Sequence, residues 1–541
     1  MLRALLGERV DAEPEATMTL AGYCSRLPLA LRVAAERAAA TPDVSLADIT
    51  SELANQRERL DLLDAAGDRL TAVRAVFSWS VRHLDDEAAR AFRLLGLHPG
   101  ADFDAYAAAA LVDATLRQAR WLLHRLARAH LIQPAGTGCY RMHDLLRAYA
   151  ADQAADQHGE QERRAALTRL FHHYLATAAV AAGTLFRADP DQPALPPPTG
   201  PVPPVASPAA ALAWLDAQQS TLVAVAAHAA SHGWPGHAIG LSTTIFRYLD
   251  VGRFADAAAV HGHAARAAAQ AGDRAAEAAA LTMLGVADAA QGRLRLATCH
   301  LEQALTLSRE DGDSIGEARA LGSLGLVDYC QGLYRQSAGR HQKALDIYTE
   351  AGDHTGEARE LHGLGVVDLR QGRYDQAAGR LRRSLALFRD AGMQSGEAVV
   401  LGNLGELELQ QGRYVQAVGH LRRSLRLGRE VGSRSSQARA LACLGVSELR
   451  RGRRRQAISH FQQALALHSQ ADNCSGQAEA LNGLGEAFLA ASQIGQASTR
   501  HAAALALAIQ CGDKHEQARA ERGLAIARQA TGSSGQARSP R

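Results

Sequence analysis

Two neighbouring stretches decide the fold: Gly356-Glu-Ala-Arg-Glu-Leu-His-Gly-Leu-Gly-Val-Val-Asp-Leu369 and Tyr374-Asp-Gln-Ala-Ala-Gly-Arg-Leu-Arg-Arg-Ser-Leu-Ala-Leu-Phe388. Each carries apolar residues at helical spacing, which are Leu361, Leu364 and Leu369 in the first and Tyr374, Ala377, Leu381, Leu385 and Phe388 in the second. Such spacing predicts one amphipathic helix per stretch. A glycine between them, Gly372, is typical of a helix end. The two stretches therefore predict a helical hairpin.

The hairpin is one member of a series with a 40-residue period. Two ladders of glycines mark the helix ends, at Gly252, Gly292, Gly332, Gly372, Gly412 and Gly452 and at Gly272, Gly312, Gly352, Gly392, Gly432 and Gly512. Because a single hairpin cannot bury its apolar face, successive hairpins must stack. The sequence therefore predicts an all-α superhelix of about seven hairpins over residues 236–530.

A further glycine recurs inside the first helix of each pair, at Gly285, Gly325, Gly365, Gly405, Gly445 and Gly485. A helix-interior glycine costs about 1 kcal/mol relative to alanine. Its recurrence predicts that another helix crosses there too closely for a Cβ atom. The pattern resembles the tetratricopeptide repeat, although the period exceeds the family's usual length of about 34 residues. This resemblance implies a superhelical groove that binds a protein or peptide.

The resemblance also implies which residues line that groove. They are Arg319, Arg359, Arg439, Arg519, His362, Asn482 and Tyr329. Two interpretations of the arginines stay open. They pair with Glu317, Glu357 and neighbouring acids on a solvated surface, or they clamp carboxylates and backbone carbonyls of an extended peptide.

Composition limits the remaining possibilities. The chain has 541 residues, enough for several domains, and a net charge of +3, which by itself indicates no polyanionic partner. The seven cysteines are scattered, which predicts reduced and mostly buried thiols in the cytoplasm. Neither a signal peptide, nor a membrane-spanning segment, nor a metal-binding motif is expected.

Prolines divide the chain at residues 188–208, which we interpret as a semi-rigid linker. Before it we expect a helical subdomain at residues 1–65, a winged-helix-like subdomain at 66–158 and a helical connector at 159–187. After it, a lead-in helix at 209–235 should precede the repeats. We expect residues 531–541 to form a disordered tail.

Three short stretches characterise the N-terminal half. They are Cys24-Ser-Arg-Leu-Pro28-Leu-Ala, Val76-Phe-Ser-Trp79-Ser-Val-Arg-His and Cys139-Tyr-Arg-Met-His143-Asp. Apolar runs around Gly136 predict a β-hairpin before the third stretch, and Asp144 is expected to cap the helix that follows it. Residues 88–98 and 110–130 are expected to be helices. Helices followed by a hairpin describe a winged helix.

Together these stretches resemble the C-terminal parts of the NB-ARC nucleotide switch of AfsR-like STAND regulators, over roughly residues 1–155. The resemblance implies that Pro28 touches the adenine and His143 the diphosphate of a nucleotide. A histidine at a helix N-terminus suits an anion. A partly buried His143 that only fixes the hairpin to the helix is the alternative.

The P-loop pattern G-x-x-x-x-G-K-[ST] does not occur in the sequence. We therefore interpret the chain as the C-terminal portion of a larger switch, and ADP or ATP would bind only if another part supplied the P-loop. No catalytic residue and no ATP hydrolysis are expected. A nucleotide-binding chain upstream is an expected partner.

The leading function is the interaction and sensor part of a signalling or transcriptional regulator. A plain repeat scaffold with a relic N-terminal half is the alternative. A DNA-binding winged helix is a further alternative. Against it, the helix at 110–130 has an apolar face that includes Trp121 and should be core, and the hairpin adds only Arg141. Direct nucleic-acid binding and membrane binding are therefore not expected.

Overall fold

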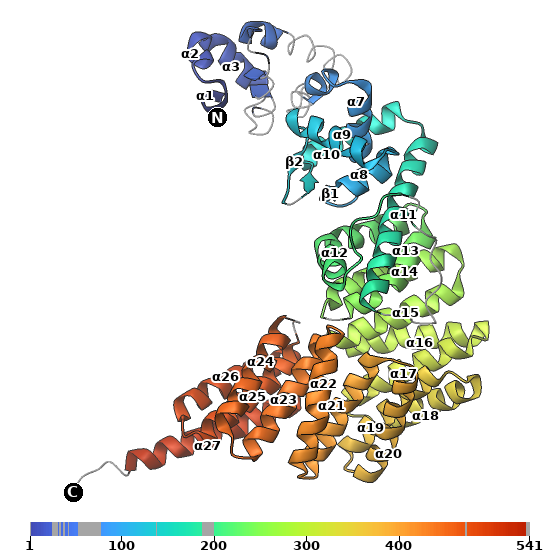
Figure 1. The fold of residues 1–541 in the computed structure, drawn as a ribbon, viewed down its shortest axis with the longest axis vertical. Helices are drawn as coiled ribbons and strands as arrows, with labels where there is room; N and C mark the ends of the chain where they lie inside the picture. Colours follow the sequence, from blue (N-terminus) through green and yellow to red (C-terminus); the bar gives the residue numbers. More distant parts are fainter. Residues whose placement is uncertain are drawn as a thin grey trace. The chain divides into compact units, whose positions relative to one another are not determined.

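The computed structural model describes residues 2–23, 31, 34–35, 38–39, 41, 43–51, 77–136, 138–186, 198, 200–250, 252–470 and 473–536. Pro28 lies outside these residues. The fold is all-α with one small sheet, as the sequence predicts (Figure 1). The chain forms two compact units, Met1–Thr184 with Pro190–His237, and Ala238–Arg541 with Leu185–Asp189.

The first unit begins with three short helices, α1 (Leu2–Leu6), α2 (Arg9–Ala12) and α3 (Pro14–Tyr23). A second group of elements then follows in the order α7 (Asp86–Leu95), β1 (Asp102–Asp104), α8 (Ala105–Val112), α9 (Leu116–Arg128), β2 (Gln133–Pro134), β3 (Cys139–Arg141) and α10 (Asp144–Gln157). The longer helices α11 (Glu160–Leu185) and α12 (Pro208–Ser231) complete the unit. Phe92, Phe103, Phe171 and Tyr174 are buried in its core.

Two features of this unit differ from the expectations. The hairpin β2–β3 is joined by a third antiparallel strand, β1, which pairs Phe103 with Tyr140. The expected helix at 110–130 is two helices, because Asp113 adopts a left-handed conformation with φ of 60°. Thr115 then begins α9 with a capping box that it forms with Gln118. The winged-helix assignment stays a prediction.

The second unit contains the repeats. Their first helices are α13 (Pro235–Leu249), α15 (Arg274–Ala290), α17 (Ser314–Cys330), α19 (His354–Arg370), α21 (Gln394–Gln410), α23 (Arg434–Arg450) and α25 (Cys474–Ala490). Their second helices are α14 (Phe254–Ala271), α16 (Leu294–Asp311), α18 (Tyr334–Ala351), α20 (Tyr374–Asp390), α22 (Tyr414–Glu430), α24 (Arg454–Gln470) and α26 (Ile494–Cys511). These seven hairpins, within the described part of the array, end on a single helix, α27 (Lys514–Gln536).

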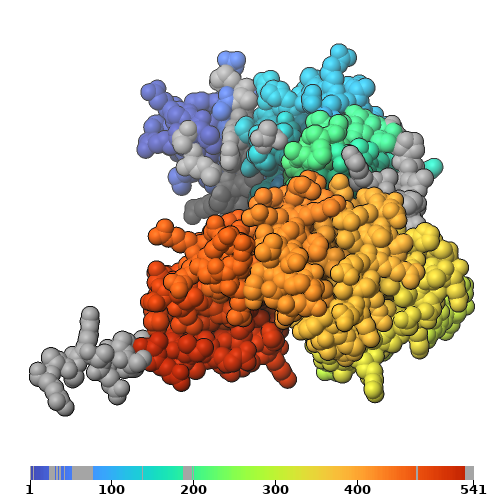
Figure 2. Space-filling view, turned by 60° about the horizontal axis from the view of Figure 1, so that its bottom comes forward, coloured from blue at the N-terminus to red at the C-terminus, as the bar shows by residue number. Residues whose placement is uncertain are grey.

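The array has two layers. Each helix from α14 to α26 packs on the next along the chain, and first helices from α15 to α25 also contact the first helix of the following repeat, ending with α27. This additional contact defines what we call the inner layer, formed by the first helices, and the second helices form the outer layer. Figure 2 shows that successive repeats are neighbours in space, since the colours follow sequence order.

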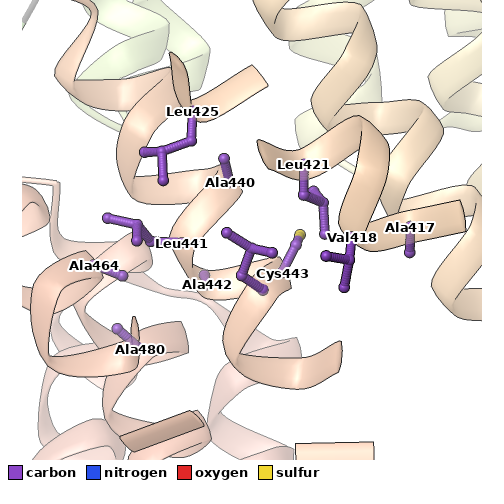
Figure 3. Close-up of a cluster of buried hydrophobic side chains, with 11 residues drawn as sticks. Ala417, Val418, Leu421, Leu425, Ala440, Leu441, Ala442, Cys443, Ala464 and Ala480 are labelled. Atoms are coloured by element: carbon purple, nitrogen blue, oxygen red, sulfur yellow. The ribbon is translucent and has the colours of Figure 1, made fainter. Parts of the chain in front are cut away.

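The mid-helix glycines lie at helix crossings, as predicted. A Cβ atom on Gly365 would be 2.8 Å from Leu381 Cγ, and one on Gly405 would be 2.5 Å from Leu421 Cδ2. Both leucines belong to the second helix of the same hairpin. Figure 3 shows how small residues continue this close packing, with Leu421 and Leu425 beside the alanines of α23.

A buried acid at the end of the first helix is a repeated feature that the sequence reasoning missed. In the fourth hairpin Asp368 is fully buried and accepts hydrogen bonds from Arg373 and Arg380, both at 2.5 Å. Equivalent pairs are Asp288 with Arg293, Glu408 with Arg413 and Glu448 with Arg453. These pairs fix the turn between the two helices of a hairpin.

The cysteines correct one expectation. Among the described residues Cys443 is buried, whereas Cys299, Cys330 and Cys511 are exposed. The prediction of mostly buried thiols is therefore wrong. Helix surfaces that face solvent tolerate cysteine, so scatter along the sequence does not indicate burial.

Candidate functional site

The inner layer of the array carries the predicted arginine ladder. Arg319, Arg359, Arg439 and Arg519 lie on α17, α19, α23 and α27, which are all first helices. Their equivalent positions follow from the 40-residue period. Arg319 and Arg359 are exposed, whereas the side chains of Arg439 and Arg519 are 40% and 18% exposed.

Arg439 takes part in a chain of contacts across four first helices, α17, α19, α21 and α23. Its Nη2 atom donates to Glu406 Oε2 at 2.7 Å. Arg370 lies 3.7 Å from the other oxygen of Glu406 and donates from Nε to the Tyr329 hydroxyl at 2.7 Å. Tyr329 and Arg439, two predicted groove residues, are thereby linked through Arg370 and Glu406, which the sequence also indicates near this face.

The same contact recurs farther along the array. Arg519 donates to both oxygens of Glu486, at 2.7 and 3.0 Å. In both pairs the acid precedes the arginine by 33 residues, which joins the first helices of adjacent repeats. Where apolar residues replace the acid, as Leu326 does before Arg359, this pairing is impossible. Two arginines of the ladder are therefore paired with an acid that lies 33 residues earlier, on the first helix of the preceding repeat.

The two expected acidic partners bind elsewhere. Glu317 accepts from Arg309, and Glu357 accepts from Arg383 on the second helix. Arg359 instead lies over the Tyr348 ring at 5.9 Å and forms no ion pair with any described residue. Glu317 and Glu357 are thus bound by Arg309 and Arg383, while Arg439 and Arg519 pair with the neighbouring acids Glu406 and Glu486. Both interpretations of the ladder stay open.

Burial and charge act in opposite directions on the acids of the inner layer. Burial alone would raise the pKa of Glu406, but Arg439 and Arg370 lower it below the ordinary value. Glu479, on α25, has a raised pKa because it is buried and lies near Glu516 and Glu406. The inner layer thus presents the exposed cations Arg319 and Arg359, and a group of acids with Arg439 and Arg519 among them around Glu479.

Two further predicted residues are used within the fold. Asn482 is fully buried, donates to Glu516 and accepts from Nδ1 of His501 at 2.9 Å. His362 Nε2 contacts the amide nitrogen of Asn403, and burial lowers the pKa of His362 to about 3. Both side chains stabilise helix packing, and neither presents an uncommitted group to a ligand in the way that Arg359 does.

Of the two nucleotide-contacting residues that the NB-ARC resemblance implies, the structure describes His143 and not Pro28. His143 is exposed and is itself the N-cap of α10, so the expectation that Asp144 caps this helix is wrong. The Leu145 amide donates to His143 Nδ1 at 3.3 Å. With Nδ1 accepting, a neutral ring carries its proton on Nε2, where it can donate to an anion.

The described residues offer neither a membrane-spanning helix nor a metal-binding cluster. They contain no helix that is long and apolar enough to cross a membrane. They also contain no group of three or more His, Cys, Asp or Glu side chains arranged to hold a metal ion.

Comparison with known proteins identifies the repeats and the relatives. A tetratricopeptide repeat model matches residues 316–390 and 396–470. Regulatory protein AfsR of Streptomyces griseus is 39% identical over 316 residues, which cover 57% of this chain and 31% of the relative. Regulatory protein AfsR of Streptomyces coelicolor is 44% identical over 176 residues, which cover 32% and 17%. The chain is therefore homologous to AfsR proteins and spans less than a third of their length.

One solved structure has a similar fold. It is a Signal Transduction ATPase with Numerous Domains, or STAND protein, with a tetratricopeptide repeat sensor from Pyrococcus horikoshii. The TM-score is 0.56 with 12% identity, and the match covers 93% of this chain and 72% of that one. At this identity the likeness shows the fold alone.

Proposed function

We propose that this chain, a homologue of AfsR regulatory proteins over part of its length, is the interaction and sensor part of a signalling or transcriptional regulator. Its ligand is a protein or peptide bound along the inner layer of the repeats. The observation that supports this proposal is that some arginines of the ladder form ion pairs within the fold and Arg359 does not. Arg439 and Arg519 are held by acids of the fold, whereas Arg359 is exposed without an acidic partner among the described residues.

The charge pattern of the inner layer defines the partner. Arg319 and Arg359 lie on adjacent repeats, and packed helices are about 8–10 Å apart. An extended peptide advances about 3.3 Å per residue, so it meets one of these arginines roughly every three residues. Exposed Leu326 on α17 and Val399 on α21, the helices on either side of Arg359, add apolar surface. The proposed ligand is an extended segment with acids spaced three residues apart, flanked by apolar side chains.

Glu479 gives the bound segment a direction. Its carboxylate lies in the acidic part of the inner layer, where burial and neighbouring acids raise its pKa. A basic side chain of the ligand at this position would relieve the repulsion between Glu479 and Glu516. The proposed segment therefore has its acidic end toward α17 and a basic residue toward α25.

The double variant Arg319→Ala, Arg359→Ala tests the proposal. Each charge-assisted contact contributes about 1.5–3 kcal/mol, so capture of the partner from cell extract should fall by at least tenfold. The thermal midpoint should stay unchanged, because both side chains are exposed. Arg439→Ala is the comparison variant and should lower both capture and stability, because it leaves Glu406 with a weaker partner.

An outer-layer pair, Arg382→Ala with Arg422→Ala, serves as the matched control, since both arginines are exposed on second helices. Equal capture by the inner-layer and outer-layer variants would reject the groove as the binding site. The proposal includes no catalysis. Pro28 and His143 are proposed only as part of a nucleotide site that a P-loop-bearing chain would complete, in a cytoplasmic setting.

A further inference from the structure

The outer face of α9 is a basic surface that the repeat function does not use. Helix α9 packs on α7 and α8 through Ala119, Leu122, Leu123 and Leu126, which are all buried. The opposite face carries Arg117, Arg120, Trp121, His124 and Arg128, which are all exposed. Their spacing of three, one, three and four residues places them on one stripe of the helix.

Trp121 corrects the sequence-based argument against nucleic-acid binding. That argument assigned Trp121 to the core with the three leucines, but its side chain is 46% exposed. The other described tryptophans, Trp79, Trp214 and Trp234, are at most 9% exposed. Trp121 therefore adds an exposed aromatic ring to the cations of the stripe.

The electrostatics of the stripe are of one sign. Helix α9 contains no acidic residue. Asp85 pairs with Arg125, and Arg125 also lies over the Trp121 ring at 4.9 Å. Asp85 is therefore paired with Arg125, and Arg117, Arg120 and Arg128 take no part in this ion pair. These three cations form no ion pair with any described residue.

The small sheet contributes little positive charge, since Arg141 is the one cation in its described strands. Arg141 on β3 is bound to Asp102 through two hydrogen bonds of 2.5 and 2.7 Å. Any polyanion on this face must therefore be held by α9 itself. The stripe spans twelve residues from Arg117 to Arg128, which is about 16 Å along the helix axis.

We infer that the outer face of α9 binds the phosphate backbone of duplex DNA. A helix with its side chains is about 10–12 Å across, and the major groove of B-DNA is about 12 Å wide and admits an α-helix. Arg117, Arg120 and Arg128 reach phosphates on the strands that flank the groove. Trp121, held by Arg125, packs on sugar or base edges. Charge complementarity favours a polyanion over any neutral partner.

Fluorescence anisotropy of a labelled duplex of mixed sequence provides the first test. The variant Arg117→Ala, Arg120→Ala, Arg128→Ala should bind at least tenfold more weakly than the parent in low salt. The matched control removes the same charge from the outer layer of the repeats, with Arg382→Ala, Arg422→Ala and Arg429→Ala, and should bind within twofold of the parent. Three phosphate contacts also predict that the parent's affinity falls roughly 40-fold when salt rises fourfold.

Acrylamide quenching of tryptophan fluorescence provides a second test. It uses the unaltered chain, so it tests DNA binding at α9 even if the α9 variant does not fold. Because Trp121 is the one exposed tryptophan among the described residues, it dominates the quenching. Duplex DNA should shield it. Equal loss of binding in both triple variants, or unchanged quenching with DNA, would overturn the inference. Shielding by polyglutamate but not by DNA would also overturn it and would assign the face to an acidic protein.

Discussion

At the residue scale, the absence of a side chain at one repeated position sets how closely the two helices of a hairpin approach. A Cβ atom on Gly365 would stand 2.8 Å from Leu381 Cγ, which is nearer than side chains tolerate. The same position has Gly325 against His341 and Gly485 against His501. The second helix can therefore carry leucine or histidine there without changing the hairpin.

Substitution of Gly365 by leucine should disturb this crossing. Overpacking a core costs about 1–3 kcal/mol, so we expect urea unfolding of Gly365→Leu to begin at lower denaturant. Gly379→Leu is the matched control. A Cβ atom there meets no atom within 4 Å, and replacing a helical glycine should raise stability by up to about 1 kcal/mol. If both variants unfold alike, the glycine ladder does not mark crossing points.

At the element scale, each hairpin is held by its buried acid and by the cap of its first helix. Asp353 caps α19 by accepting from the Gly356 amide at 2.8 Å, and Asp273, Asp313 and Asn473 do the same in other repeats. Asp368 closes the other end of α19 on Arg373 and Arg380. Both ends of a first helix are thus fixed by side chains of the turns.

Removal of one turn acid should loosen one hairpin. Asp368 is fully buried, so Asp368→Ala leaves two arginines without their acceptor and should cost about 1–3 kcal/mol of unfolding free energy. Arg373 and Arg380 are 40% and 33% exposed and can regain water, which keeps the cost below that of an enclosed pair. Asp390→Ala, at an exposed position near the end of α20, should be nearly neutral. Equal stability of the two variants would show that the turn acid is dispensable.

Helices and turns that are marked by a pattern of nearby residues could be predicted from the sequence. Side-chain contacts between repeats could not. The 40-residue period gave the hairpins and the crossing glycines. The break between α8 and α9 had a readable signal as well, because Thr115 with Gln118 is a capping-box pattern. The pairing of Arg439 with Glu406 depends on which first helices become neighbours, and no local pattern carries that information. The prediction that Trp121 is buried was wrong for a similar reason. Helical spacing places Trp121 beside the stripe of buried leucines and not within it.

At the scale of the whole molecule, the chain combines a repeat array with a smaller N-terminal unit, and the two have different surface chemistry. The array presents arginines, apolar residues and Glu479 along its inner layer. The N-terminal unit presents the basic stripe of α9. This division suits a regulator in which a protein ligand and a polyanion are bound by separate units. The AfsR homologues are more than three times longer than the part that this chain matches.

Site-specific photocrosslinking tests the central claim that the inner layer binds the protein partner. A photoreactive amino acid would replace Val399, which lies on α21 at the ladder position between Arg359 and Arg439, or Val415, which is exposed on the second helix α22. If the inner layer binds the partner, position 399 should crosslink to it, and this crosslink should disappear when Arg319→Ala and Arg359→Ala are added. Position 415 should give no crosslink to the same partner. A crosslink from position 415 without one from position 399 would show that the inner layer is not the binding surface.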